Sequence, residues 1–221
     1  MSPLNGFEIL LVGGGGGLGA ATAELLVSEG AKVVISSRSH GVCADITVAA
    51  DRERLLEAVP NLYGLVVLAG NPARGAGEEM YRLSHQVNYE GPILLARAAA
   101  EQMKARGVSG SIVLFSTMQA VALFPGSTVY AGEKAALAHA ARILAKEYRA
   151  FLRVNVIAPG VMNAGMAQAS ISSGKYDRYI EEGAIARFGV AADVARAVRF
   201  FLEPDNYVTG QVLSVDGGIT L

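Results

Sequence analysis

Cysteine and tryptophan are almost missing from the 221-residue sequence, which has one cysteine, Cys43, and no tryptophan. A single cysteine excludes an intramolecular disulfide, so a reducing compartment, the cytoplasm, is the expected location. Histidine is also scarce, and His40, His85 and His139 have no metal-ligand spacing to one another or to Cys43. We therefore predict no metal site.

An excess of one charge and long apolar runs are missing as well. The 19 Lys and Arg residues face 20 Asp and Glu residues, for a net charge of −1. This balance argues against a nucleic-acid surface and against a polybasic membrane contact. No apolar run approaches the roughly 18 residues of a membrane span, and we expect no signal peptide. The expected partner is a small molecule, with no nucleic acid and no membrane.

Apolar residues are abundant and follow a regular pattern. They make up 52% of the sequence, and short apolar runs alternate with helical patterns along the whole chain. This alternation predicts an α/β fold of the doubly wound Rossmann type, with a mostly parallel seven-stranded sheet and helices on both faces. No repeat or linker interrupts the series, so we predict one domain over residues 1–221. The predicted strands are 8–12, 32–36, 41–44, 65–69, 111–116, 153–158 and 211–215.

The predicted helices fill the gaps between these strands, with one exception. The first begins near Leu18 and ends at Gly30, and the others cover residues 51–59, 79–106, 130–149 and 192–203. The segment between the second and third strands is too short for the crossover helix that normally joins parallel neighbours. We therefore predict that this helix is deleted.

Five consecutive glycines, Gly13 to Gly17, lie between the first predicted strand and the first predicted helix. Glycine permits positive φ and a close backbone approach to a phosphate, and a helix N-terminus attracts the anion. We predict a dinucleotide pyrophosphate site here. Two registers fit, Gly14-x-Gly16-x-x-Gly19 and Gly13-x-x-x-Gly17-x-Gly19, so the loop alone leaves the subclass open. The predicted contacts are Gly13, Gly15, Gly16, Gly17, Leu18 and Gly19.

The end of the second predicted strand lacks the acidic residue that would bind the ribose 2′-hydroxyl of NAD. Ser37, Arg38 and Ser39 stand there instead, and their donors suit a 2′-phosphate. A charge-assisted contact of roughly 1.5–3 kcal/mol predicts a preference for NADP(H) over NAD(H) of about ten- to a hundredfold. An ordinary solvated Arg38 is the alternative.

Tyr130 and Lys134 lie one helical turn apart, so both side chains project from one face of the predicted helix. Tyrosine, with an ordinary pKa of about 10, needs a nearby cation to act as a base at neutral pH. Thr117 follows the predicted strand 111–116, with Ser116 as a competing hydroxyl, and Asn88 lies on an earlier helix. The Tyr-Lys pair alone is a weak motif, but these surroundings strengthen it.

With these residues in this order, the chain resembles the classical short-chain dehydrogenases/reductases from Leu4 to Gly218. The resemblance implies an NADP(H)-dependent oxidoreductase that interconverts a carbonyl and a secondary alcohol. It is carried by Gly13-x-x-x-Gly17-x-Gly19, Ala69-Gly70, Asn88, Thr117, Tyr130-x-x-x-Lys134, Arg153-Val154-Asn155, Pro159-Gly160, Thr209-Gly210-Gln211 and Val215-Asp216-Gly217-Gly218.

The resemblance also implies roles for single residues. Tyr130 would be the general acid/base, Thr117 would hydrogen-bond the substrate oxygen, and Lys134 would hold the nicotinamide ribose. Asn88 would seat a water that relays the proton. The chain would form a homo-oligomer, a tetramer or a dimer. Further cofactor contacts are implied at Asp45, Ile46, Leu68, Ala69, Gly70, Pro159, Gly160 and Met162.

Some features leave other functions open. Leu68 stands where the family usually has asparagine, and Ala164 stands where a threonine commonly meets the nicotinamide amide. The main alternative is a cofactor-binding sensor with little turnover. An isomerase or dehydratase that acts on nucleotide sugars is a weaker alternative. The segment 162–187 is predicted to form a mobile lid that sets specificity. Arg74 is either a contact for an acidic substrate group or a solvated side chain.

Overall fold

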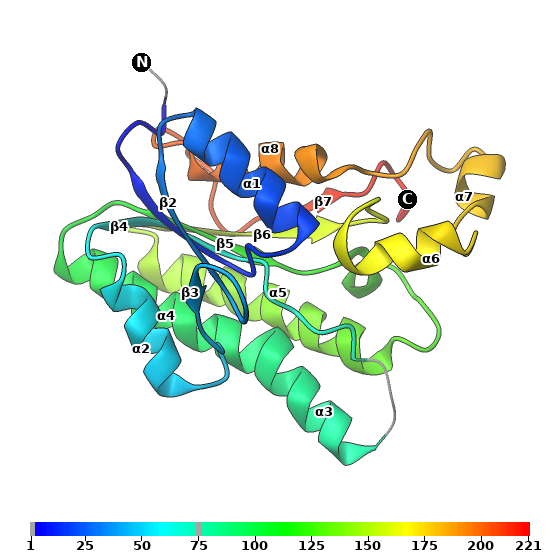
Figure 1. The fold of residues 1–221 in the computed structure, drawn as a ribbon, viewed down its shortest axis with the longest axis horizontal. Helices are drawn as coiled ribbons and strands as arrows, with labels where there is room; N and C mark the ends of the chain where they lie inside the picture. Colours follow the sequence, from blue (N-terminus) through cyan, green and yellow to red (C-terminus); the bar gives the residue numbers. More distant parts are fainter. Residues whose placement is uncertain (1–2, 74–76) are drawn as a thin grey trace.

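The computed structural model describes residues 3–73 and 77–221, and its centre is one parallel sheet (Figure 1). The strand order is β3-β2-β1-β4-β5-β6-β7. This confirms the predicted doubly wound arrangement, although β4 begins at Leu62 rather than at Leu65 because Gly64 already pairs with Ile9. The strands are β1 (Glu8–Val12), β2 (Lys32–Ser37), β3 (Val42–Cys43), β4 (Leu62–Val67), β5 (Ser111–Phe115), β6 (Arg153–Pro159) and β7 (Val212–Val215).

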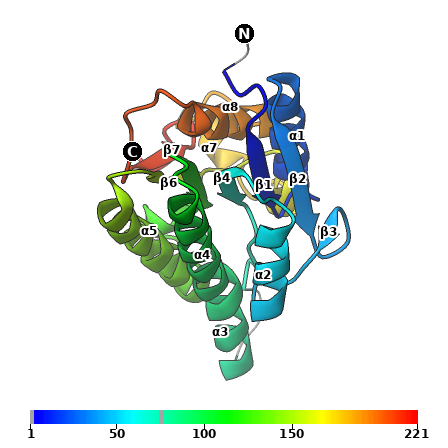
Figure 2. The same ribbon diagram turned by 90° about the vertical axis from the view of Figure 1, so that its left-hand side faces the viewer.

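Helices cover both faces of the sheet (Figures 1 and 2). Helices α1 (Gly17–Ser28) and α8 (Ala191–Leu202) lie on one face, and α2 (Ala49–Glu57), α4 (Gly91–Ala105) and α5 (Thr128–Tyr148) lie on the other. Alternate residues of β1 point to opposite faces of the sheet. Ile9 and Leu11 pack into the core under α1 and α8, whereas Leu10 and Val12 pack into the core on the opposite face. None of the described helices is long and apolar enough to cross a membrane.

The connection between β2 and β3 contains no helix, as predicted. Residues 38–41 form a tight turn in which His40 donates its backbone N–H to the Ser37 hydroxyl at 2.7 Å. Gly41 completes the turn at φ +69°, a conformation that favours glycine. A right-handed crossover would have placed the lost helix on the α1 face. Val33 and Ile35 on that face of β2 are only half-buried, as is Val34 on the opposite face.

The predicted helix 79–106 is interrupted, which corrects the expectation of one continuous helix. It consists of α3 (Glu78–His85), a π-helical turn η1 (Gln86–Glu90) and α4. The interruption has a local cause, because Pro92 lacks a backbone N–H and a side chain at Gly91 would lie 3.0 Å from the Gln86 carbonyl oxygen. Such π turns occur often at functional sites, and this one contains Asn88.

The segment 163–188 projects beyond the carboxyl end of the sheet (Figure 1). It holds the short helical pieces η3 (Gly165–Ala167), α6 (Gln168–Ser172) and α7 (Arg178–Glu181). Its two ends are joined at the base, because Asn163 donates its N–H to the Gly189 carbonyl at 2.7 Å and Gly189 donates to the Val161 carbonyl at 3.0 Å. The predicted lid is therefore a loop closed at its base, although its mobility remains a prediction.

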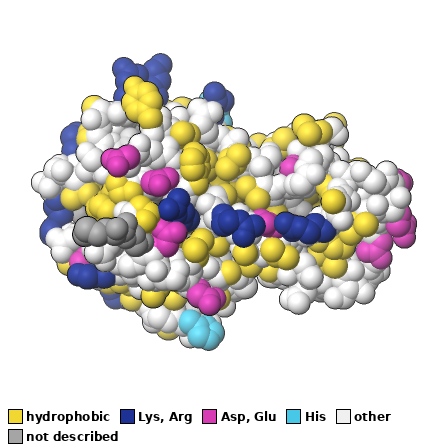
Figure 3. Space-filling view, turned by 90° about the horizontal axis from the view of Figure 1, so that it is seen from above, with side chains coloured by type: hydrophobic (Ala, Val, Ile, Leu, Met, Phe, Trp, Pro, Cys, Tyr) yellow, Lys and Arg dark blue, Asp and Glu magenta, His cyan; other side chains and the backbone are white. Residues whose placement is uncertain are grey.

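The surface over α1 and α8 carries positive and negative side chains interspersed with apolar ones (Figure 3). This mixture agrees with the near-zero net charge of the chain.

Candidate active site

The glycine loop lies at the point where strand order reverses, between β1 and its neighbours β2 and β4. Gly13 has φ +86°, and a Cβ there would lie 2.6 Å from the backbone nitrogen of Ala69. A Cβ on Gly19 would lie 2.5 Å from the Cα of Gly14. Because Gly19 belongs to both registers, the choice rests on Gly13, whose positive φ and close backbone contact favour the Gly13-x-x-x-Gly17-x-Gly19 register. Because Gly16 caps α1 without a side chain, the first amides of the helix are available to a phosphate, as a dinucleotide requires.

The turn after β2 presents the three residues predicted at the 2′-phosphate. The Ser37 hydroxyl is used within the turn, since it donates to the His40 carbonyl at 3.1 Å, and Ser39 pairs with the His40 ring at 2.9 Å. Arg38 is exposed, and no described residue makes a hydrogen bond or ion pair with its guanidinium. A Cβ on Gly15 would lie 3.0 Å from Ser37 Oγ, so this turn adjoins the glycine loop.

Asp45 and Ile46, predicted at the adenine, follow β3. The Asp45 carboxylate accepts from the backbone and hydroxyl of Thr47 at 2.9 and 2.8 Å. Ile46 is 5% exposed and belongs to the hydrophobic core, so any cofactor contact from it has to come from its backbone. Neither residue lines the large cavity described next.

A cavity of about 560 Å³ lies at the carboxyl ends of β4, β5 and β6 and contains Tyr130, Lys134 and Thr117. Tyr130 is on the first turn of α5, and its hydroxyl lies near the Thr117 side chain. Burial raises the pKa of Tyr130 to about 12, although the neighbouring Thr117 side chain opposes this shift. The predicted contacts Leu18, Leu68, Gly70, Pro159, Gly160 and Met162 line the same cavity, as does Ala164.

Lys134 lines the cavity, although its side chain is almost fully buried. Its Nζ donates to the Phe115 carbonyl at 2.9 Å, and burial lowers the pKa of the amine to about 8. Gly70 lies beside it, because a Cβ there would be 3.6 Å from Lys134 Nζ and 3.3 Å from Asn88 Oδ1. The backbone after β4 therefore approaches both predicted catalytic side chains closely.

Asn88 is fully buried and fixes the segment that follows β4. Its Oδ1 accepts from the backbone N–H of Asn71 at 2.9 Å, while its Nδ2 donates to the Asn71 carbonyl at 2.8 Å and to Ser84 Oγ at 3.1 Å. The amide is thus already used in positioning the backbone. A water-seating role for Asn88 remains a prediction.

Ser116 and Thr117 differ in what their hydroxyls bind. Ser116 Oγ donates to the backbone carbonyl of Lys134 at 2.9 Å, which joins β5 to α5. Thr117 Oγ1 accepts from the Gln119 backbone at 3.3 Å and also contacts Tyr130. This arrangement favours Thr117 as the substrate-binding hydroxyl.

Several cavity residues escaped the sequence analysis, among them Gln119, Phe124 and Tyr81. The sequence could have indicated Gln119, because it is a polar residue only two positions after Thr117. Arg74 lies outside the described residues, so its two predicted roles stay open. Within the described ranges, no group of three or more His, Cys, Asp or Glu side chains is arranged to hold a metal ion.

Comparisons with known proteins show similarity to oxidoreductases. The family model described as "Enoyl-(Acyl carrier protein) reductase" matches residues 42–220. Carbonyl reductase family member 4 of Danio rerio is 32% identical, with 96% of this chain and 97% of the relative covered. Dehydrogenase/reductase SDR family member 4 of Sus scrofa is 31% identical, with 98% and 88% covered.

Solved structures of short-chain dehydrogenases/reductases have the same fold as this chain. A short chain dehydrogenase/reductase family protein superimposes with a TM-score of 0.88 at 31% identity, with 100% of both chains covered. The ligand-free aldohexose dehydrogenase of Thermoplasma acidophilum also reaches 0.88, at 25% identity, with 99% and 96% covered.

The doubly wound sheet and the matched family together define an α/β oxidoreductase. The chain belongs to the short-chain dehydrogenase/reductase family.

Proposed function

We propose that this protein is an NADP(H)-dependent oxidoreductase that interconverts a carbonyl and a secondary alcohol, with Tyr130 as the general acid/base. The observation that carries the proposal is the proximity of the Tyr130 and Thr117 side chains in the cavity, with Lys134 buried one helical turn away. A proton donor and a second hydroxyl can then meet on one substrate oxygen.

Tyr130 and Thr117 act on the same oxygen in both directions. In reduction, Tyr130 donates its proton to the substrate oxygen while Thr117 donates a hydrogen bond to it. In oxidation, Tyr130 accepts the proton of the alcohol. The nicotinamide ring, when bound, supplies or accepts the hydride. A pKa of about 12 keeps Tyr130 protonated at neutral pH, which suits the reductive direction.

Lys134 supports the oxidative direction. Its pKa of about 8 leaves the amine mostly protonated at neutral pH. A positive charge near the phenol would favour the tyrosinate that oxidation needs, whereas in this structure burial dominates the pKa of Tyr130. The Phe115 carbonyl holds the amine at 2.9 Å beside the Gly70 backbone. In this position Lys134 also suits the nicotinamide ribose, as the family resemblance implies.

The choice of NADP(H) rests on the turn after β2. Ser37, Arg38 and Ser39 include no carboxylate. The two serine hydroxyls are hydrogen-bonded within the turn, whereas Arg38 has no partner among the described residues. A 2′-phosphate beside Arg38 would gain a charge-assisted contact, which the 2′-hydroxyl of NAD(H) lacks. We also propose a homo-oligomer, a tetramer or a dimer, which light scattering tests.

The test is NADPH consumption with a panel of ketones and aldehydes. Wild type is expected to turn over, whereas Tyr130→Phe is expected to bind NADPH without turnover. Tyr176→Phe is the matched control, because Tyr176 lines the same cavity. Undiminished turnover by Tyr130→Phe would contradict the assignment. Tight NADPH binding by wild type with no turnover on any substrate would favour the sensor.

A further inference from the structure

Gln119 is a polar side chain of the cavity that the proposed reaction does not use. It lies in the short 3-10 turn η2 (Met118–Ala120), directly after Thr117. Its backbone N–H donates to Thr117 Oγ1 at 3.3 Å, so the turn that orients Thr117 also orients Gln119. Both side chains line the cavity together with Tyr130.

The Gln119 carboxamide is held in one orientation by Ser127, the residue that precedes α5. The Ser127 hydroxyl donates a hydrogen bond to Gln119 Oε1. Because a carboxamide oxygen only accepts, this contact fixes Oε1 toward α5 and leaves Nε2 as the donor end. No described residue accepts a hydrogen bond from Nε2, so its two N–H donors are available to a ligand.

The described lining of the cavity carries little charge and mixes polar with apolar side chains. Among its described lining residues, Lys134 is the only side chain that carries a formal charge at neutral pH, and its Nζ is bound to the Phe115 carbonyl. Met80, Phe124 and Val129 contribute apolar surface. A carboxylate or phosphate on the substrate would find no free cation among these residues and would lose its hydration. The described lining residues therefore favour a neutral ligand.

We propose that Gln119 is a substrate-binding residue that selects neutral ketones carrying a second hydrogen-bond acceptor close to the reacting carbonyl. This inference rests on the proposed function. Thr117 binds the reacting oxygen, and Gln119 Nε2 donates to the second acceptor, an ester, amide or ether oxygen. Consecutive Cα atoms are about 3.8 Å apart, so Thr117 and Gln119 lie within about 8 Å of each other and the two acceptors are only a few bonds apart.

Three probes separate the effect of a second hydrogen-bond acceptor from the effect of negative charge. Ethyl acetoacetate is neutral and carries the second acceptor, 2-heptanone has the same chain length without it, and acetoacetate carries a negative charge. The dissociation constant of each probe is measured on the NADP⁺-loaded protein by calorimetry, and kcat/KM is measured with NADPH. Binding needs no turnover, so the result stands even where the proposed reaction fails.

The expected difference in affinity between the probes is that of one hydrogen bond. Wild type is expected to bind ethyl acetoacetate about tenfold more tightly than 2-heptanone, and Gln119→Leu is expected to abolish this ratio. Ser127→Ala is expected to reduce the ratio by a smaller factor, because it frees the carboxamide to rotate. Thermal unfolding and NADPH affinity report whether each variant is folded.

Three outcomes would overturn the inference: equal binding of the ester and 2-heptanone by wild type, an unchanged ratio in folded Gln119→Leu, or preferred binding of acetoacetate. A tenfold binding ratio without any turnover would instead refute the proposed reaction while supporting the role of Gln119.

Discussion

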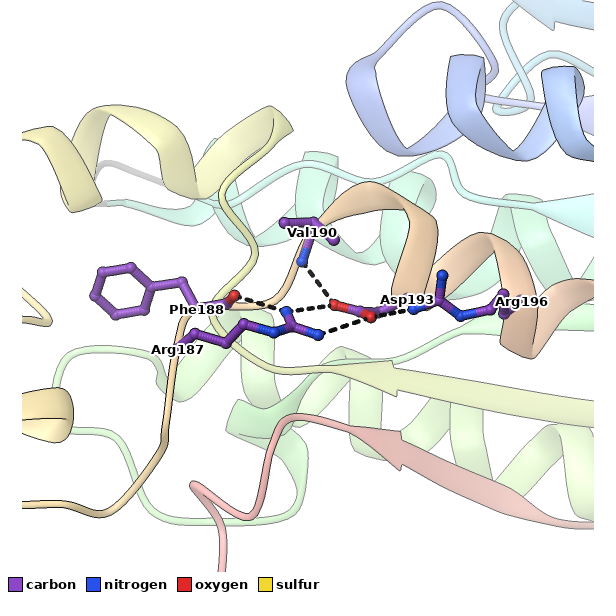
Figure 4. A network of polar contacts seen from close by, with 5 residues as sticks. All are labelled: Arg187, Phe188, Val190, Asp193 and Arg196. Atoms are coloured by element: carbon purple, nitrogen blue, oxygen red, sulfur yellow. Dashed lines mark hydrogen bonds and ion pairs between the residues drawn. The ribbon is translucent and has the colours of Figure 1, made fainter.

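Arg187 and Asp193 form a two-point ion pair, with Arg187 NH1 donating to Oδ2 at 2.8 Å and NH2 to Oδ1 at 3.0 Å (Figure 4). The same carboxylate accepts from the Val190 backbone at 2.8 Å and from Arg196 at 2.5 Å. Asp193 thus caps α8 and also anchors the end of segment 163–188. The Arg187 hydrogen bonds and the Val190 hydrogen bond hold the pKa of Asp193 at about 2.

Replacing this carboxylate is expected to loosen the base of the segment. Because the folded-state pKa lies below the ordinary Asp value, the stabilisation is present above about pH 4 and is lost as pH falls through about 2. At neutral pH, Asp193→Asn should therefore speed hydrogen exchange in residues 163–188 several-fold. Glu53→Gln, at an exposed position of α2, is the control. Equal exchange in both variants would show that the ion pair does not anchor the segment.

The two adjacent hydroxyls after β5 should respond differently to substitution. Thr117→Val is expected to lower kcat/KM by roughly ten- to a hundredfold through loss of a hydrogen bond to the reacting oxygen, and Thr117→Ser to restore most of it. Ser116→Ala should instead lower the free energy of unfolding by about 1 kcal/mol, because the Lys134 carbonyl loses its donor. Steady-state kinetics and urea unfolding measure the two effects. A larger kinetic loss in Ser116→Ala than in Thr117→Val would reverse the assignment.

Burial of Lys134 should make the stability of the cofactor-free protein depend on pH. The unfolded chain keeps its Lys134 proton up to about pH 10.5, whereas the folded chain releases it near pH 8. The cost of burying the charge, roughly 3 kcal/mol at neutral pH, is therefore relieved as pH rises from 8 to 10.5. Lys134→Met should lack this rise.

The Lys134 test compares urea unfolding of wild type and Lys134→Met from pH 7 to 10. Tyr130 is present in both proteins and titrates at higher pH, so its contribution cancels. Parallel stability curves for the two proteins would mean that the Lys134 amine is not charged and buried at neutral pH.

Arg38 should decide the cofactor preference. Arg38→Ala is expected to weaken NADPH binding about ten- to a hundredfold and to leave NADH binding nearly unchanged, because only the 2′-phosphate meets the guanidinium. Thermal-shift titration with both cofactors measures this difference. Arg149→Ala, at an exposed position after α5, is the control. Retention of the full NADPH preference in Arg38→Ala would remove the basis for choosing NADP(H).

The alkaline limb of the pH profile should differ between the two reaction directions. Reduction needs protonated Tyr130, so its rate should stay flat across neutral pH, well below the pKa of about 12. Oxidation needs Tyr130 to accept a proton, so its rate should rise with pH. Initial rates in both directions, with one ketone and its alcohol, measure the two profiles. Identical profiles would argue against Tyr130 as the acid/base.

Local sequence was sufficient wherever a feature depends on neighbours along the chain. The strands follow from apolar runs such as 111–116, and Tyr130 and Lys134 share a helix face because helical spacing places residues four apart together. The missing helix after β2 follows from chain length alone, since the few residues of the turn cannot form a crossover.

Features that depend on contacts across the fold required the tertiary structure. The glycine register is favoured by the close approach of Gly13 to Ala69, which follows strand β4. Thr117 is favoured over Ser116 because β5 packs on α5 and directs the Ser116 hydroxyl to the Lys134 carbonyl. Gln119 becomes a candidate only because Ser127 meets its carboxamide. Spacing along the chain carries no information about such contacts, because they arise only when the packed sheet and helices bring distant residues together.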